Sequence, residues 1–372
     1  RRLKAIFTAP SLQMVSLTIT EKGYVLKDGS GTWLPVIRED LENGPENPRH
    51  TMSSLAAGLY ARYQAGAMPL ALVSMDNCSR NGDRLRESVT AVAHGWRERN
   101  LVPEDFLSYL TDEKRVAFPF TMIDKITPRP SDMVETRLTE KGIEGMQPVL
   151  TDKGTFIAPF VNAEHPEYLV VEDRFPAGRP PLEKAGVYMT DRDTVGRTER
   201  MKVTTCLNPL HTAMSIFGCL LRHPFIYEEM RDPDILALVR RLGYDEGLPV
   251  AEDPGILSPK AFLDEVLTER LPNPFLPDSP ERIMTDTSQK VGIRFGETLR
   301  QYIATGRSLD GLTAIPLAIA GWVRYLVGVD EGGNELQLSA DPLKSSIHEE
   351  LAAIHWDGTA SSTGQRRGSL YD

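Results

Sequence analysis

The chain has 372 residues, of which 41% are hydrophobic and 25% are charged, as in a soluble globular protein with room for two domains. Its formal net charge of −10 and its pI near 5.4 exclude a general nucleic-acid-binding protein, because phosphate contacts need a basic face. An anionic small molecule is not excluded, since local arginines and lysines set the potential of a cleft.

The cysteines and histidines give no pattern of a disulfide or metal protein. Cys78, Cys206 and Cys219 are scattered and form no CxxC pair, and the seven histidines are dispersed. We therefore predict no bound metal. No run of about 18 apolar residues is present, and no signal-peptide pattern follows Arg1. We expect a cytoplasmic protein without a membrane segment.

The first half of the chain predicts an α/β domain. Residues 15–20 are rich in β-branched side chains, and 71–75 form a short apolar run typical of a buried parallel strand. Helices are expected at 51–66 and 83–97. The segment 33–49 is polar and contains prolines, so we expect it to be irregular.

A polar loop follows the apolar run. It reads Asp76-Asn77-Cys78-Ser79-Arg80-Asn81-Gly82 and would lie at the carboxyl edge of the sheet, where α/β sheets bind ligands. We predict Thr20, Ser74 and Asp76 as cofactor-binding residues. A GxGxxG fingerprint after a strand is missing, and Gly29 and Gly31 lie in a polar turn instead.

Two further strands are predicted, and the chain then changes from strand patterns to helical patterns. Strands are expected at 116–124 and 168–172. Beyond residue 199 helical patterns dominate, at 212–222, 234–242, 258–271, 288–305 and 312–327. We predict a Rossmann-like dinucleotide-binding domain at 1–195, a helical substrate-binding domain at 196–357 and a polar, mobile tail at 358–372.

The segment 201–211, MKVTTCLNPLH, carries the strongest chemical signal. It places a potential base, Lys202, an amide donor, Asn208, and an imidazole, His211, within ten residues. Oxidation of a secondary alcohol needs such a set, because a base removes the hydroxyl proton while donors hold the oxygen. A lysine acts as this base only where burial or neighbouring cations lower its pKa by roughly 3 units.

Several segments together resemble the mannitol dehydrogenase family of long-chain polyol and hexuronate dehydrogenases. They are 76–82, Phe118-Pro119 with Met122–Pro128, and 202–211, joined in the same order by 16–24, 172–186, 282–290 and 322–326. The resemblance covers roughly residues 1–345. It implies metal-free hydride transfer between NAD and a sugar alcohol or sugar acid, with NADP left open. It also implies a glycine loop upstream of 16–24, so we expect the chain to begin inside the Rossmann domain.

The resemblance implies a role for each site residue. Lys202 would be the general base, and Glu199 would relay its proton. Asn77 and Asn208 would donate to the substrate oxygen. His211 would hydrogen-bond the substrate, and Asp124, Arg282 and Lys290 would line its far end.

Structural explanations compete with these roles. Asn208 before Pro209 has the pattern of a helix N-cap, and the Asp-Asn and Asn-Gly pairs of the loop are common turn residues. His211 could be a core histidine, while Arg282, Lys290 and Lys202 could be solvated surface charges.

Two departures from the family pattern concern this segment. Asn208 follows Lys202 by six residues where the family has five, and Pro209 stands where the family has glycine. One extra residue turns a helix by about 100°, so we expect a helical bulge here, or else Lys202 is not the base.

The combined prediction is an NAD-dependent enzyme for D-mannonate and D-fructuronate. Mannitol 2-dehydrogenase and tagaturonate reductase are the alternatives within the class. A catalytically silent sugar-binding protein is the alternative outside it. The predicted partner is a small sugar acid or sugar alcohol, and the sequence leaves the oligomeric state undetermined.

Overall fold

The computed structural model describes residues 2–127, 130–152, 154–330 and 332–351. Contacts divide the described chain into two units. Unit 1 contains the residues up to Asp124 and Glu167–Glu199, and unit 2 contains Lys125–Pro166 and the residues from Arg200 onward. The segment 125–166, predicted within the first domain, thus clusters with the helical unit. The boundaries at 195 and 357 stay predictions, and the tail 358–372 lies outside the described residues.

A three-stranded parallel sheet forms the centre of unit 1. It has the order β1 (Met14–Leu17), β2 (Leu70–Ser74) and β3 (Val116–Ala117). Both pairs are parallel, with Val15 opposite Leu72 in the first. Every residue of β2 is buried, as expected of a parallel strand that is covered on both faces.

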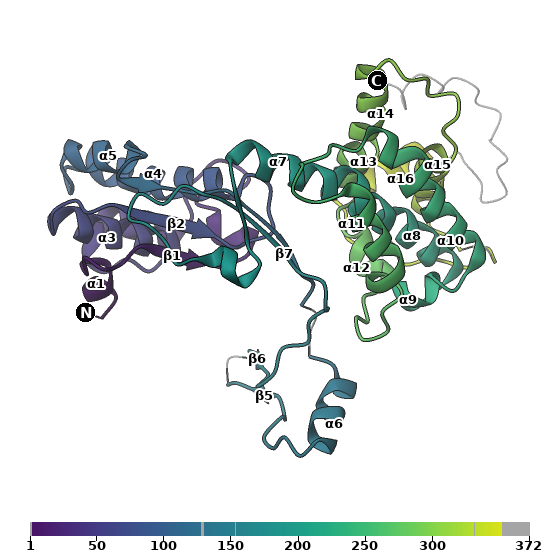
Figure 1. The fold of residues 1–372 in the computed structure, drawn as a ribbon, viewed down its shortest axis with the longest axis horizontal. Coiled ribbons are helices and arrows are strands. Elements are labelled where there is room, and N and C mark those ends of the chain that lie inside the picture. Colours follow the sequence, from purple (N-terminus) through teal and green to yellow (C-terminus); the bar gives the residue numbers. More distant parts are fainter. Residues whose placement is uncertain (1, 128–129, 153, 331, 352–372) are drawn as a thin grey trace. The chain divides into compact units, whose positions relative to one another are not determined.

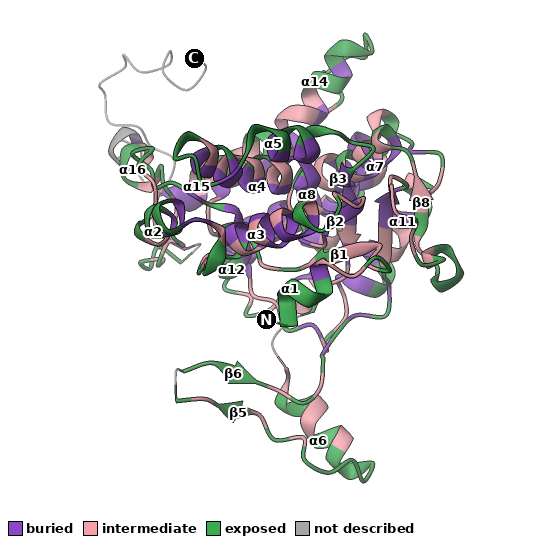
Figure 2. Ribbon diagram, turned by 90° about the vertical axis from the view of Figure 1, so that its left-hand side faces the viewer, coloured by how far each residue is buried: buried purple, intermediate pink, exposed green. Residues whose placement is uncertain are grey.

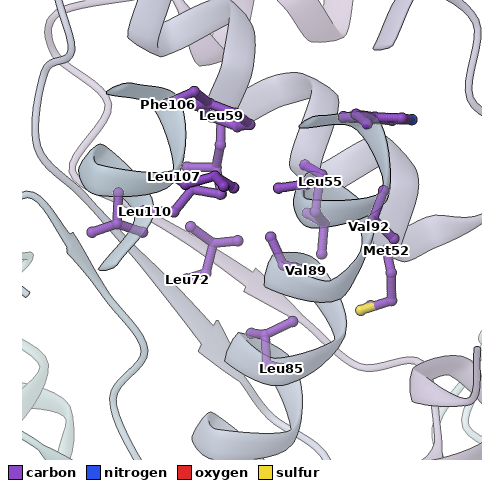
Figure 3. Packing of buried hydrophobic residues seen from close by; sticks show 14 of the residues in the cluster. Met52, Leu55, Leu59, Leu72, Leu85, Val89, Val92, Phe106, Leu107 and Leu110 are labelled. Atoms are coloured by element: carbon purple, nitrogen blue, oxygen red, sulfur yellow. The ribbon is translucent and has the colours of Figure 1, made fainter. Parts of the chain in front are cut away.

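Three helices cover one face of this sheet. They are α3 (Thr51–Gln64), α4 (Asn81–Glu98) and α5 (Glu104–Thr111). Leu72 of β2 points toward them, and the next residue, Val73, belongs to a smaller cluster on the opposite face. Figure 3 shows the helical side of the core, formed by Met52, Leu55, Leu59, Leu85, Val89, Val92, Phe106, Leu107 and Leu110.

A second sheet of unit 1 is mixed. The antiparallel pair is β4 (Thr121–Asp124) with β7 (Tyr168–Glu172), and β8 (Tyr188–Thr190) pairs with β7 in parallel. The strand predicted at 116–124 is therefore two strands, β3 and β4. Pro119 stands between them and has no N–H for a sheet hydrogen bond.

The prediction that 33–49 is irregular was wrong. This segment contains α2 (Pro35–Asn43) and the 3-10 helix η2 (Gly44–Glu46). Pro35 occupies the first turn, where its missing N–H costs nothing. Ile37 and Leu41, four residues apart, bury the same face of α2.

Arg62 of α3 fixes the chain that leads into β1. Its side chain is 1% exposed and donates five hydrogen bonds of 2.6–3.0 Å, all to backbone carbonyls. The acceptors are the carbonyl oxygens of Phe7, Ala9, Leu12, Met68 and Pro69.

The remaining elements of unit 1 are short. They are α1 (Arg2–Phe7), the 3-10 helices η1 (Glu21–Tyr24) and η3 (Leu182–Ala185), and α7 (Arg192–Arg200).

Unit 2 is built around α8 (Asn208–Leu221), which packs against α9, α10, α12, α13 and α15 (Figure 1). Its other α-helices are α9 (Ile226–Glu229), α10 (Pro233–Arg240), α11 (Pro259–Glu265), α12 (Pro280–Met284), α13 (Thr287–Arg294), α14 (Gly296–Ala304), α15 (Ala314–Leu326) and α16 (Lys344–Leu351). Beyond residue 200, unit 2 also contains three π-helices, η4 (Met201–Cys206), η5 (Arg241–Gly247) and η7 (Val266–Arg270), and the 3-10 helix η6 (Leu248–Val250).

The five predicted helices of this half are all present, with two differences. The helix predicted at 288–305 is two helices, α13 and α14, which meet at Phe295. The helix predicted at 258–271 begins as α11 and continues as the π-helix η7. Local sequence periodicity does not distinguish the two, because a π-helix of five residues is too short to show a period of its own, and its hydrogen bonds span only one residue more than those of an α-helix.

The segment 125–166 of unit 2 carries α6 (Asp132–Glu140) and the hairpin of β5 (Val149–Leu150) and β6 (Phe156–Ile157). The hairpin strands are exposed, as the green ribbon in Figure 2 shows. A buried ion pair anchors the end of the segment: Arg270 donates to both carboxylate oxygens of Glu164 at 2.8 Å.

None of the described helices is long and apolar enough to cross a bilayer.

Candidate active site

The backbone between Lys202 and Asn208 is a π-helix. Residues 201–206 form η4, and the N–H of Leu207 donates to the carbonyl of Lys202 at 3.1 Å, an i to i+5 bond. Pro209 gives the reason, because its ring would clash with the carbonyl four residues before it in a continuous α-helix. The bulge expected from the six-residue step is therefore present.

Lys202 lies inside the protein. Its side chain belongs to the largest that are fully buried, with 1% exposure. The alternative of a solvated surface lysine is therefore wrong. Nearby, Thr298 donates to the carbonyl of Thr204 at 2.8 Å, which ties the π-helix to α14. The burial that a lysine base requires is met.

Asn208 and His211 lie one turn apart on the same side of α8. The N-cap of α8 is Leu207, so Asn208 is the first helical residue and not the cap. Neither side chain has a hydrogen-bond partner among the described residues, which leaves both available for a ligand. Burial lowers the pKa of His211 to about 4, so its imidazole is neutral at physiological pH.

His211 lines a cavity of about 380 Å³ within unit 2. Two arginines, Arg270 and Arg282, also line it, together with Asp278. The rest of the wall is mostly apolar and consists of Ile126, Thr127, Leu207, Ile226, Leu271, Leu276 and Pro277. A mainly apolar wall with a few polar groups is typical of a small-molecule site.

The two predicted cations at the far end of the substrate belong to neighbouring helices. Arg282 of α12 forms an ion pair with both carboxylate oxygens of Asp278. Lys290 of α13 donates to the carbonyls of Ile283, at 3.1 Å, and Thr285. Burial, followed by the charge of Arg294, lowers the pKa of Lys290. Arg282 stays exposed, whereas Lys290 is partly buried.

In unit 1 the three predicted cofactor residues form one hydrogen-bond network. The carboxylate of Asp76 accepts from the N–H of Thr20 at 2.7 Å and of Ile19 at 2.9 Å. Tyr24 donates to the same carboxylate at 2.5 Å and lies 2.7 Å from the hydroxyl of Ser74. Asp76 thus holds the loop after β1, where Thr20 has a φ of 63°, a strained value for a β-branched residue.

Asn77, Asp124 and Glu199 are the other predicted residues in unit 1. Asn77 is exposed in the loop after β2, and Asp124 is buried at the end of β4. Glu199 lies in α7, close enough to Cys78 that its charge adds to the burial that raises the pKa of this thiol to about 11. These positions are in unit 1, while Lys202, Asn208, His211, Arg282 and Lys290 are in unit 2.

Asn81 and Gly82 begin α4 and are more than turn residues. The Asn81 amide donates to the carbonyl of Asp76 at 3.0 Å and to the hydroxyl of Thr121 at 2.7 Å. A side chain on Gly82 would place its Cβ 2.5 Å from the carbonyl oxygen of Phe118. The pair therefore joins α4 to the segment between β3 and β4.

Sequence reasoning missed Arg294. This residue ends α13, four positions after Lys290, and donates to the hydroxyl of Thr212, the neighbour of His211 on α8. The four-residue spacing places Lys290 and Arg294 on one helical face, and that signal was present in the sequence. Among the described residues no three His, Cys, Asp or Glu side chains gather as a metal site would need.

Comparison with known proteins gives the family. The mannitol dehydrogenase Rossmann domain matches residues 4–184, and the mannitol dehydrogenase C-terminal domain matches residues 195–360. A D-mannonate oxidoreductase of Thermotoga maritima is 53% identical over 366 residues, which cover 97% of this chain and 67% of the relative. A mannitol 2-dehydrogenase of Phaeosphaeria nodorum is 33% identical, over 91% of this chain and 56% of the relative.

Two solved structures of dehydrogenases are also similar to this chain. A D-sorbitol dehydrogenase without substrate superimposes with a TM-score of 0.77 at 26% identity, covering 92% of this chain and 65% of the other. The Pseudomonas fluorescens mannitol 2-dehydrogenase in complex with NAD and D-mannitol gives a TM-score of 0.66 at 29% identity, covering 94% and 66%. The chain spans about two thirds or less of the length of these relatives.

The chain belongs to the mannitol dehydrogenase family. The predicted family is therefore confirmed, as is the predicted order of a Rossmann-like α/β domain followed by a mainly helical domain. Membership supports the prediction of an NAD-dependent oxidoreductase that acts on a CH–OH group.

Proposed function

We propose that the protein is an NAD-dependent oxidoreductase that interconverts D-mannonate and D-fructuronate. The observation that carries the proposal is the pair of unpartnered side chains, Asn208 and His211, next to the π-helix that holds the buried Lys202. The 53% identity to a D-mannonate oxidoreductase supports this substrate over a neutral polyol.

Each polar group of unit 2 has a definable task. Lys202 takes the proton of the substrate hydroxyl on its amine while the C–H electron pair leaves the same carbon as hydride. The amide of Asn208 donates to the oxygen on which charge develops, and such a donor contributes roughly 3–4 kcal/mol. His211 stays neutral at pH 7 and hydrogen-bonds the substrate without adding charge.

The residues of unit 1 fit a nucleotide cofactor in one respect. Asp76 holds the loop after β1 against the loop after β2, both at the carboxyl edge of the parallel sheet, where dinucleotides bind. Bound NAD would supply the acceptor for the hydride. Thr20 and Asn77 would hold it or the substrate from these loops, and Ser74 and Asp76 would position Thr20.

The remaining predicted residues have supporting tasks. Glu199, three residues before Lys202, would relay the proton from the lysine to solvent. Asp124, Arg282 and Lys290 would line the far end of the substrate. The proposed partner is thus a small sugar acid.

The test is NADH oxidation by the complete protein with D-fructuronate, D-tagaturonate and D-fructose in turn. We expect the highest kcat/KM with D-fructuronate. A preference for D-fructose would instead indicate a mannitol 2-dehydrogenase, in line with the similarity to that enzyme. No turnover with any of the three, together with no NADH binding by fluorescence, would leave a catalytically silent sugar-binding protein.

A further inference from the structure

Three arginines lie near the His211 imidazole, and carboxylates neutralise two of them. Arg270 and Arg282 line the same cavity as His211, and Arg294 donates to Thr212, the next residue of α8. Burial is the main cause of the lowered pKa of His211; the charge of Asp278 opposes the shift, and the charges of Arg294, Arg282 and Arg270 add to it. Arg270 is paired with Glu164, and both side chains are 0–1% exposed. Arg282 is paired with Asp278. Neither of these pairs offers a net charge to a ligand.

Arg294 is different. Its guanidinium donates to the neutral hydroxyl of Thr212, and no carboxylate pairs with it in the part of the chain that the structure describes. Burial lowers its pKa to about 10, so it stays protonated at neutral pH. One positive charge therefore remains uncompensated beside His211.

An uncompensated, partly buried charge is costly, and a bound anion would remove the cost. A guanidinium has five N–H donors in a planar fork, which matches the two oxygens of a carboxylate. Lys290, one turn earlier on α13, adds a second cation. A sugar acid carries a carboxylate that can use these donors, and a polyol does not.

We propose that Arg294 binds the carboxylate of the substrate and thereby sets the preference for a sugar acid over the corresponding neutral sugar. The inference rests on the proposed function, because it concerns the substrate of that same site. Arg294 is a specificity residue in this proposal: it binds the acid group and takes no part in proton or hydride transfer.

The test compares an acid and a neutral substrate in the complete protein. For Arg294→Gln we expect kcat/KM for D-fructuronate to fall about 10- to 100-fold, the loss of a charged hydrogen-bond pair, while kcat/KM for D-fructose changes less than about 3-fold. Arg294→Lys keeps the charge and should recover part of the loss. Arg300→Gln is the matched control, since Arg300 is an exposed arginine paired with Glu297 on α14.

A second readout does not depend on turnover. D-mannonate, added with NAD, should raise the Tm of the wild-type protein and of Arg300→Gln, and it should raise that of Arg294→Gln far less. Without ligand, Arg294→Gln should melt no earlier than the wild type, because it loses an uncompensated charge.

Two outcomes would overturn the inference. One is an equal loss of kcat/KM for the acid and the neutral substrate, and the other is a full Tm shift by D-mannonate in Arg294→Gln. If the wild type turns over D-fructose and not D-fructuronate, and D-mannonate gives no Tm shift, the proposed function itself fails.

Discussion

The N–H of Leu207 donates to the carbonyl of Lys202 across 3.1 Å and closes a π-turn directly before α8. It forms the bulge that is expected where six residues, instead of the five of the family pattern, lead from Lys202 to Asn208. Without it, the extra residue would rotate Lys202 by about 100° relative to Asn208. In the proposed active site the wide turn thus sets the position of Lys202 relative to Asn208, in keeping with the frequent location of π-bulges at functional sites.

Lys202→Met should lower kcat by about 10²- to 10⁴-fold, because the base that accepts the hydroxyl proton is lost. Lys202→Arg should be equally inactive, since a guanidinium cannot give up its proton at neutral pH. Lys260→Met is the control, as Lys260 is exposed and paired with Asp264. Steady-state kinetics and circular dichroism would check both, and full activity of Lys202→Met at pH 7 would contradict the role.

Asn208→Ala should lower kcat by about 10²- to 10³-fold with little change in Tm. The catalytic loss follows from the missing oxyanion donor. The small effect on Tm follows from the finding that Leu207, and not Asn208, caps α8. Thermal melts measured beside kcat distinguish the two roles, because loss of a cap would lower Tm and leave kcat in the folded fraction unchanged.

The neutral His211 makes stability depend on pH. Its folded pKa of about 4 lies below the ordinary 6.5, so the unfolded chain binds the proton more tightly. The contribution is fully present above pH 6.5 and is lost as pH falls toward 4, to a limit of about 3 kcal/mol, less for a partly exposed ring. Urea unfolding at pH 4.5 and 7.5 should show a smaller difference in His211→Gln than in the wild type.

Glu229 produces the opposite dependence. It is 0% exposed, neither carboxyl oxygen has a hydrogen-bond partner among the described residues, and burial raises its pKa to about 9. The folded state keeps the proton that the unfolded chain releases near pH 4.5. Stability is therefore fully present below pH 4.5 and falls by about 1.4 kcal/mol per pH unit up to pH 9.

Glu229→Gln should remove this slope, because an amide does not titrate in that range. Unfolding free energies measured from pH 5 to 9 would check it, with Glu228→Gln as the control, since Glu228 is the neighbouring residue of α9. An unchanged slope in Glu229→Gln would show that the carboxyl is not protonated in the folded protein.

Much of the fold could be predicted from local patterns. The strand at 168–172 and the helix at 51–66 follow from an apolar run and from periodic leucines. The helix α2 could not, because Pro35 and the polar residues around it obscure a face formed by two residues only. The placement of 125–166 depends on Glu164 pairing with a residue 106 positions away, which no local pattern contains.

Part of the candidate site could likewise be predicted from the sequence, and part could not. Lys202, Asn208 and His211 are close in sequence, and their spacing, compared with the family pattern, predicted the bulge that the structure contains. Arg294 becomes meaningful only when Arg270 and Arg282 are seen to be neutralised by acids, and that is a tertiary fact. A charged side chain can be recognised as unpaired only when its neighbours in space are known, and the sequence does not give these neighbours.

Arg62 has a consequence for how this protein can vary. All five of its hydrogen bonds reach main-chain oxygens, so the path of the chain into β1 is fixed without reference to any side chain there. A substitution on that path at a residue outside the core therefore leaves these five bonds in place. Replacement of Arg62 by lysine does not, because a lysine has three donors and no planar fork to reach five acceptors.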